Sequence, residues 1–115
     1  MLFDFSISEQ PTCLIISLSG ELIEKNQAID LLKKVDELVA SGKTKIAINL
    51  AELKYMNSSG LNTMIQLLTK ARKDGGEVVI CNMNKKINEL LLITKLNTLF
   101  KVVETEAEAV TLLGK

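Results

Sequence analysis

Apolar and polar residues alternate at the beginning of the chain. Residues 3–8, with the sequence FDFSIS, alternate one by one, which is the period of a half-buried strand. Residues 12–19 form a second, more apolar run after a break at residues 9–11. So short a break predicts an antiparallel hairpin at the edge of a sheet. We expect the backbone to leave the second strand at Gly20.

From about residue 25 the apolar residues recur at intervals of three and four, which is the spacing of one face of a helix. This stripe ends before residues 41–42, and a second stripe runs from Leu61 to residues 74–76. Both stops contain glycine, which commonly follows the end of a helix. The same spacing predicts helices over residues 85–94 and 105–113. The members of the first stripe are Ala28, Leu31, Leu32, Val35, Leu38 and Val39.

Three further strands are predicted between these helices. Residues 45–50 and 77–81 are short, nearly continuous apolar runs, typical of strands that are covered on both faces. Residues 99–103 are predicted to form the last strand, and residues 51–57 a loop. The resulting order, β-β-α-β-α-β-α-β-α, predicts one α/β domain over residues 1–115 with a mixed, mostly parallel sheet.

Composition and charge exclude several classes of function. Apolar residues make up 47% of the 115 residues but aromatic residues only 3%, so side chains that stack on nucleic-acid bases are scarce. Lys plus Arg and Asp plus Glu both number 14, and no cluster of positive charge favours nucleic acid. No apolar run reaches the ~20 residues of a membrane span, and residues 1–5 do not resemble the start of a secretory signal. We therefore expect a cytoplasmic protein that neither binds nucleic acid nor inserts into a membrane.

The chain contains no histidine, which excludes Ser-His and Cys-His nucleophilic mechanisms and argues against an enzyme. Its two cysteines, Cys13 and Cys81, each lie in an apolar run. A disulfide between them stays open, but two buried, reduced thiols are favoured. Two cysteines without histidine are too few for a metal site, and no glycine-rich phosphate loop follows a strand. We expect neither a metal nor a cofactor.

Asn57, Ser58, Ser59 and Gly60 lie between a predicted strand and a predicted helix. Functional groups of α/β sheets gather at such junctions, and the amides and dipole at a helix start favour a negative group. A phosphate on Ser58 would add about −1.5 to −2 charge to this surface. The other interpretation is that Asn57 or Ser58 caps the helix, a role that both residue types prefer. The two interpretations are compatible.

Residues 49–61, with the sequence NLAELKYMNSSGL, resemble the signature of STAS domains, and among these of anti-sigma factor antagonists. The block Gly20-Glu21-Leu22 and the sequence GGEVVIC at residues 75–81 match the same family. The resemblance covers essentially the whole chain in the element order given above. Ser-Ser-Gly-Leu would be a weak signal by itself, and the flanking blocks make it fairly specific.

The resemblance implies a phospho-regulated partner switch in the control of transcription. Such proteins, when unphosphorylated, bind an anti-sigma factor serine kinase and displace the sigma factor that it held. The kinase then uses ATP to phosphorylate the serine that corresponds to Ser58, and a PP2C-type phosphatase resets the switch. Two positions depart from the family pattern. Asn57 stands where aspartate is common, and Ile23, followed by Glu24, stands where an acid often follows Gly-Glu-Leu.

The partner is expected to bind the Ser58 turn, the loop of residues 22–26 and the exposed side of the following helix. Spacing places Asn62, Gln66 and Thr69 on the polar face of that helix. Elsewhere, residues 90–93 form the apolar run LLLI, of which we expect most to be in the core and one or two residues to be exposed. The candidate partner-binding residues are Leu22, Ile23, Glu24, Asn26, Met56, Leu61, Asn62, Gln66 and Thr69.

Two other functions stay open from the sequence. A non-switching STAS subunit of a membrane transport or signalling assembly would use the same turn for docking, with Ser58 only as a cap, and Asn57 favours this rival. A serine hydrolase would need an activated nucleophile, yet the chain has neither histidine nor a Gly-x-Ser-x-Gly elbow. Nothing in the sequence supports the hydrolase positively.

Overall fold

The computed structural model describes residues 2–114. Its strands are β1 (Asp4–Glu9), β2 (Leu14–Leu22), β3 (Lys45–Met56), β4 (Glu77–Cys81) and β5 (Lys101–Val102). Its helices are α1 (Ile29–Ala40), α2 (Ser58–Lys73), α3 (Lys85–Ile93) and α4 (Glu106–Leu113). Short 3₁₀ helices, η1 (Lys25–Ala28) and η2 (Leu96–Thr98), precede α1 and β5. Apart from these two turns, the order is the one that the sequence predicts.

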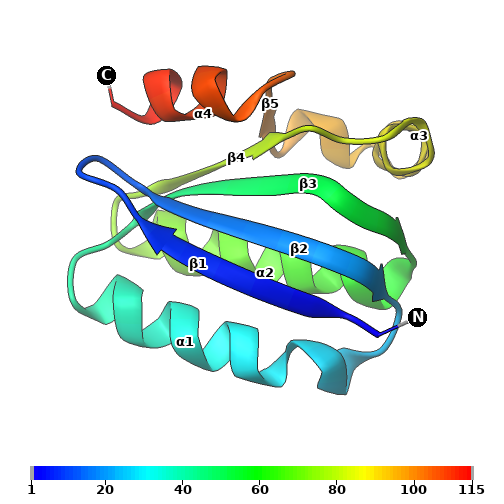
Figure 1. Ribbon diagram of the computed structural model, residues 1–115, viewed down its shortest axis with the longest axis horizontal. Helices are drawn as coiled ribbons and strands as arrows, with labels where there is room; N and C mark the ends of the chain where they lie inside the picture. The colour runs from blue at the N-terminus through cyan, green and yellow to red at the C-terminus, as the bar shows by residue number, and fades with distance from the viewer. Residues whose placement is uncertain (1, 115) are drawn as a thin grey trace.

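The strands of residues 2–114 form one sheet in the order β1-β2-β3-β4-β5. β1 pairs antiparallel with β2, and all other neighbours are parallel. Helices α1 and α2 lie on one face of the sheet, α4 lies on the other, and α3 lies beyond the end of β4 (Figure 1). The α/β class and the antiparallel edge hairpin are therefore confirmed. In this part of the chain no helix has both the length and the apolar character of a membrane span.

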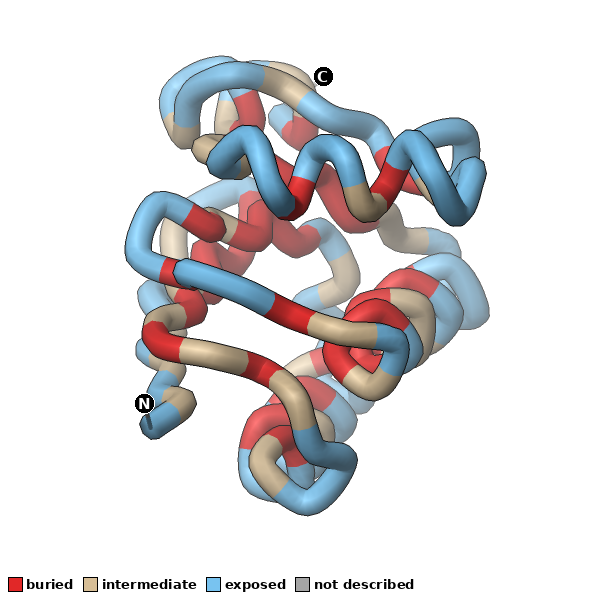
Figure 2. Tube along the Cα trace, turned by 90° about the vertical axis from the view of Figure 1, so that its right-hand side faces the viewer, coloured by how far each residue is buried: buried red, intermediate tan, exposed pale blue. Residues whose placement is uncertain are grey.

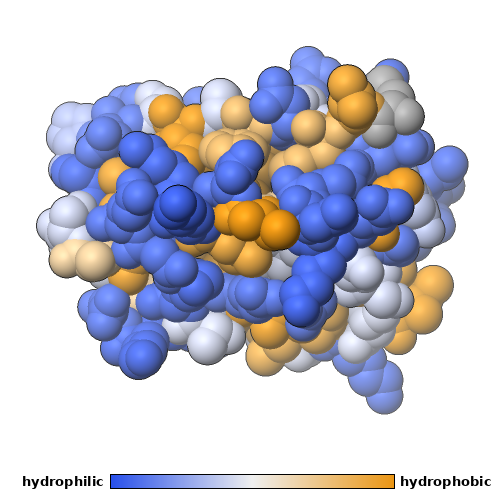
Figure 3. Space-filling view, turned by 90° about the horizontal axis from the view of Figure 1, so that it is seen from below, coloured by the Kyte–Doolittle hydropathy of each residue, from blue (hydrophilic) through white to orange (hydrophobic). Residues whose placement is uncertain are grey.

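The main core lies between the sheet and helices α1 and α2, and buried segments of both helices and strands face it (Figure 2). Of the predicted stripe, Leu32 and Leu38 are partly buried against this core. The outer face of α1 and α2 is mostly hydrophilic, with hydrophobic side chains showing between the polar ones (Figure 3). The buried members of the stripe are Ala28, Leu31, Val35 and Val39. A smaller cluster under α4 consists of Cys13, Ile15, Ala47, Val79, Cys81, Ala109 and Leu113.

Two predicted strand ends are wrong. β2 continues through Gly20 to Leu22, and residues 51–56 belong to β3 instead of forming a loop. The ladder between β2 and β3 has two register shifts around residues 17–21 of β2, and the burial of residues 51–56 in β3 does not follow the one-by-one alternation that marks a strand. Gly20 stays in the strand with φ +82°, and a Cβ on it would lie 1.8 Å from the carbonyl oxygen of Leu2.

The last strand is shorter than predicted. β5 has 2 residues instead of the range 99–103, because η2 forms before it and Phe100 turns into the core. In the apolar run of residues 90–93, Leu91 is buried, whereas Leu92 and Ile93 are 51% and 79% exposed. The expectation of one or two exposed residues in this run is confirmed, whereas the expectation that most of it is core is wrong, because only Leu91 is buried and Leu90 is partly buried.

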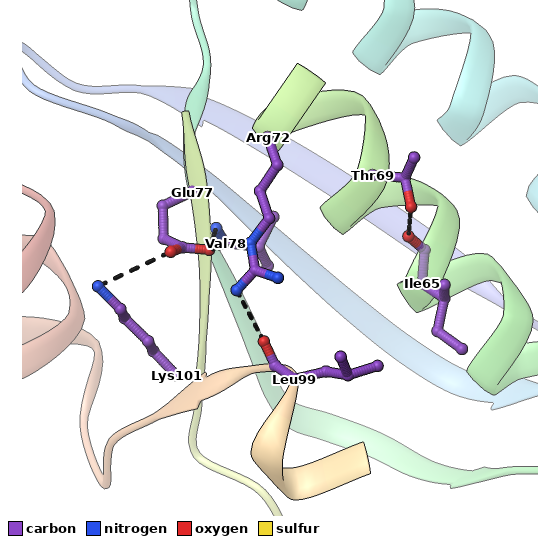
Figure 4. Close-up of polar contacts among 7 residues, drawn as sticks. All are labelled: Ile65, Thr69, Arg72, Glu77, Val78, Leu99 and Lys101. Carbon is purple, nitrogen blue, oxygen red and sulfur yellow. Dashed lines mark hydrogen bonds and ion pairs between the residues drawn. The ribbon is translucent and has the colours of Figure 1, made fainter. Parts of the chain in front are cut away.

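The C-terminal end of α2 is anchored by Arg72. Its Nε donates a hydrogen bond to Oε1 of Glu77 at 3.0 Å, and its Nη2 donates to the carbonyl oxygen of Leu99 at 2.8 Å. The Nζ of Lys101 lies 3.7 Å from Oε2 of the same glutamate. Figure 4 shows how this cluster joins α2, β4 and the segment before β5. The cluster thus ties the end of α2 opposite Ser58 to β4 and to the segment before β5.

Cys13 and Cys81 are free and buried, which confirms the prediction of reduced thiols. Burial raises the pKa of the Cys81 thiol from 9.0 to about 11, with a smaller contribution from the charge of Glu106. Because the thiolate is the reactive form, the folded chain near pH 8 should hold about a hundredfold less Cys81 thiolate than the unfolded chain. We expect iodoacetamide to label Cys81 at least about a hundredfold more slowly in native protein than in urea, as measured by mass spectrometry. Equal rates would contradict the burial of this thiol.

Candidate functional site

The turn between β3 and α2 is held by the side chain of Asn57. β3 ends at Met56 and α2 begins at Ser58. The Oδ1 of Asn57 accepts hydrogen bonds from the backbone N–H of Ser59 at 3.0 Å and of Gly60 at 3.2 Å. These amides have no partner within the helix, so the bonds are those of a helix cap. Of the two residues that the sequence offers as the cap, Asn57 takes the role.

Ser58 is the first residue of α2 and is exposed. Its hydroxyl forms no hydrogen bond with any other residue in the range 2–114. The first turn of α2 contains no acidic residue, and its basic residues lie in the last turn. A negative group on Ser58 would therefore meet the positive end of the helix dipole without a carboxylate beside it in that turn.

Gly60 lets α2 begin directly against the end of β2. A Cβ at this position would lie 2.5 Å from the carbonyl oxygen of Leu22 and 2.6 Å from the Cβ of Met56. The backbone N–H of Asn57 donates to the same carbonyl of Leu22 at 3.4 Å. The Ser58 turn and the end of β2 are thus in direct contact.

Two side-chain amides hold the segment that follows β2 beside this turn. The Nδ2 of Asn57 donates to the carbonyl oxygen of Ile23 at 2.9 Å. From η1, the Oε1 of Gln27 accepts from the N–H of Ile23 at 2.8 Å and of Glu24 at 2.9 Å. The Nε2 of Gln27 donates to the carbonyl oxygen of Glu21 at 3.2 Å. Gln27 was not among the predicted site residues, although Glu24-x-x-Gln27 before a helical stripe has the spacing of a capping box and could have revealed it.

The structure brings only part of the predicted partner surface to the outside. Leu22, Met56 and Leu61 are at most 4% exposed, so their side chains form the base of the turn, and assigning them to the partner surface is wrong. Ile23 and Gln66 are half-buried. The exposed candidates are Glu24, Asn26, Asn62 and Thr69.

Thr69 lies at some distance from the turn. At 1.5 Å per residue it is about 16 Å farther along α2 than Ser58. Its Oγ1 donates to the carbonyl oxygen of Ile65 at 2.9 Å (Figure 4). The structure therefore places Thr69 away from the Ser58 turn, one helical turn from Gln66.

Two exposed apolar side chains, one in α1 and one in β3, were not predicted. Ile29, the first residue of α1, is 58% exposed, and Tyr55 in β3 is 43% exposed. Tyr55 pairs with Glu21 in the ladder between β2 and β3. Ile29 lies outside the apolar stripe of its helix, which is a signal that the sequence does offer. Tyr55 lies two residues before Asn57 and adds apolar surface close to the polar turn.

The turn presents an exposed serine hydroxyl at the start of α2. Among residues 2–114 there is no group of three or more His, Cys, Asp or Glu residues placed to hold a metal ion. A serine nucleophile needs an adjacent base, and no side chain of the described residues is hydrogen-bonded to the hydroxyl of Ser58.

Known proteins share this fold and parts of this sequence. A family model described as "STAS domain" matches residues 4–109. The anti-sigma F factor antagonist of Paenibacillus polymyxa is 29% identical over 100 residues, which cover 85% of this chain and 84% of that protein. The crystal structure of an anti-sigma factor antagonist from Mycobacterium paratuberculosis has a TM-score of 0.84 at 19% identity, over 98% of this chain and 95% of that chain.

Two forms of a third relative, the Bacillus cell fate determinant SpoIIAA, have also been solved. The unphosphorylated form has a TM-score of 0.76 at 19% identity, over 96% of this chain and 97% of that chain. The phosphorylated form has a TM-score of 0.75 at 20% identity, over 96% of this chain and 99% of that chain. At these identities the similarity shows a common fold.

Proposed function

The chain belongs to the STAS domain family, and on this premise we propose that it is an anti-sigma factor antagonist switched by phosphorylation of Ser58. In this role the unphosphorylated chain binds an anti-sigma factor serine kinase in the cytoplasm and displaces the sigma factor. The observation that carries the proposal is the exposed Ser58 hydroxyl at the first residue of α2. The names of the relatives supply the class of partner.

In the phosphorylation step the chain is the substrate. The Ser58 oxygen attacks the γ-phosphorus of ATP, a P–O bond forms, the bond to ADP breaks, and the hydroxyl proton passes to a base. No side chain of the described residues is bonded to this hydroxyl, so the base and the ATP site belong to the kinase. A PP2C-type phosphatase restores the hydroxyl by hydrolysis, in which water attacks phosphorus and inorganic phosphate leaves.

Release of the partner follows from the added charge. A phosphate places about −1.5 to −2 charge on the turn, close to the half-buried Ile23 and the exposed ring of Tyr55. Burying that charge in an interface costs free energy, and an acidic group on the partner would repel it. The unphosphorylated and phosphorylated forms of SpoIIAA both share the fold of this chain, with TM-scores of 0.76 and 0.75, which supports a switch that retains the fold.

We expect the purified chain to gain one phosphoryl group, at Ser58, when it is incubated with its kinase and ATP and examined by tandem mass spectrometry. Ser58→Ala should gain none. Ser59→Ala should react like the wild type, because Ser59 is half-buried and takes part in the cap through its backbone N–H. Modification only at another residue would contradict the proposal. A pull-down that recovers components of a membrane transport or signalling assembly, and no kinase, would favour the non-switching subunit.

A further inference from the structure

We infer that Asn57 and Gln27 are positioning residues that fix residues 21–24 against the Ser58 turn, so that the two segments form one preformed docking surface. The use of this surface rests on the proposed function, whereas its geometry does not. A side-chain amide suits the task because it carries a donor and an acceptor in one plane.

Asn57 uses both ends of its side chain. Its Oδ1 accepts from the N–H groups of Ser59 and Gly60, and its Nδ2 donates to the carbonyl oxygen of Ile23 at 2.9 Å. Helix capping accounts for the oxygen only. An aspartate would retain the cap but has no donor, and its second oxygen would face the carbonyl of Ile23. The amide nitrogen therefore has a separate role, which is to join the turn to the segment after β2.

Gln27 holds the same segment from the side of η1. Its Oε1 accepts from two consecutive N–H groups, those of Ile23 and Glu24, and its Nε2 donates to the carbonyl of Glu21. Residues 23 and 24 lie between β2 and η1 and belong to neither element. Connecting segments of this kind are ordinarily more mobile than the elements they join. Here two amide side chains provide the bonds that a strand or helix would otherwise supply.

The fixed segment presents the half-buried Ile23 and the exposed Glu24 beside Ser58. A surface that is ordered before binding loses less conformational entropy when a partner docks. A partner that contacts Ser58 therefore meets both side chains in set positions. A phosphate on Ser58 then changes the charge of a rigid surface without changing its shape.

The test is amide hydrogen exchange, followed by NMR residue by residue on the full chain without a partner. Asn57→Asp has no donor and adds a charge, and Asn57→Ser adds no charge but replaces the Nδ2 group by a shorter hydroxyl that does not reach as far as Nδ2 toward the carbonyl of Ile23. Both retain a capping oxygen. In both variants we expect exchange at the N–H of Ile23 and Glu24 to rise about fivefold or more, as for the loss of one hydrogen bond. Amides in the middle of α2 should change by less than about twofold, because the cap is retained.

Asn84→Asp is the matched control. The Oδ1 of Asn84 caps α3, and its Nδ2 donates to two backbone carbonyls at the end of β3. The substitution thus makes the same chemical change at another helix, and exchange at residues 23 and 24 should stay at the wild-type rate. An unchanged rate in both Asn57 variants, or an equal rise in Asn84→Asp, overturns the inference.

Phosphoserine installed at position 58 during translation provides a second measurement that needs no kinase. A preformed surface should keep the slow exchange of residues 23 and 24 in the phosphorylated chain. A rise of about fivefold or more would overturn the inference, because the segment would then depend on the state of Ser58. If no kinase modifies Ser58, the proposed function is contradicted, but the expected amide exchange rates of residues 23 and 24 do not change. The two tests can therefore fail independently.

Discussion

Ser58→Asp is expected to weaken binding of the anti-sigma factor kinase about a hundredfold, whereas Ser58→Ala should bind within about threefold of the wild type. The carboxylate places a full negative charge on the exposed first residue of α2, where an interface must desolvate it or oppose it with like charge. Alanine removes a hydroxyl that has no hydrogen bond to the described residues. Isothermal titration calorimetry of each variant with the kinase measures both affinities.

Thr69→Asp serves as the control for charge. It adds the same charge to the same helix about 16 Å away, which is beyond the Debye length of about 8 Å at physiological salt. Thr69 is exposed, so the substitution should disturb neither folding nor the turn, and we expect less than about a threefold loss of affinity. Equal affinities of Ser58→Asp and Ser58→Ala, or equal losses at positions 58 and 69, would contradict a docking surface centred on Ser58.

The order of elements could be predicted because its signals are local. The stripe from Ala28 to Val39 faces the core, as its spacing of three and four indicates. The end of β3 has no such signal. Residues 51–56 pair with β2 across two register shifts, and their burial does not alternate. Their strand conformation depends on a partner strand that is distant in the sequence, and spacing within the segment cannot reveal it.

The Ser58 turn could be found because few residue types begin helices and the motif lies at a strand–helix junction. Its surroundings could not be found in the same way. Met56 and Leu61 were expected at the partner surface because they are close to Ser58 in sequence, yet the last residue of β3 and the fourth of α2 both point into the core. The bond from Gln27 to Glu21 forms only once η1 folds back against the end of β2.

Gly60→Ala is expected to lower the free energy of unfolding by about 2 to 3 kcal/mol, with a fall in Tm of about 10 °C. The sign is opposite to that of an ordinary helix position, where glycine to alanine stabilises by about 0.5 to 1 kcal/mol. The added Cβ would lie 2.5 Å from the carbonyl oxygen of Leu22 and 2.6 Å from the Cβ of Met56. Both atoms belong to strands at the centre of the sheet, which cannot yield without loss of pairing. Urea denaturation and calorimetric melting measure the change.

Gly114→Ala makes the same substitution after α4, where φ is −80° and the nearest atom to an added Cβ is 3.4 Å away. It should change stability by less than about 0.5 kcal/mol. At temperatures well below its Tm, the Gly60→Ala variant should also show faster amide hydrogen exchange at residues 23 and 24. The added Cβ moves α2 away from β2, which stretches the hydrogen bond from Nδ2 of Asn57 to the carbonyl oxygen of Ile23. A Gly60→Ala chain as stable as the wild type would contradict the close approach of α2 to β2. That approach is what places Ser58 beside the segment that Asn57 and Gln27 hold.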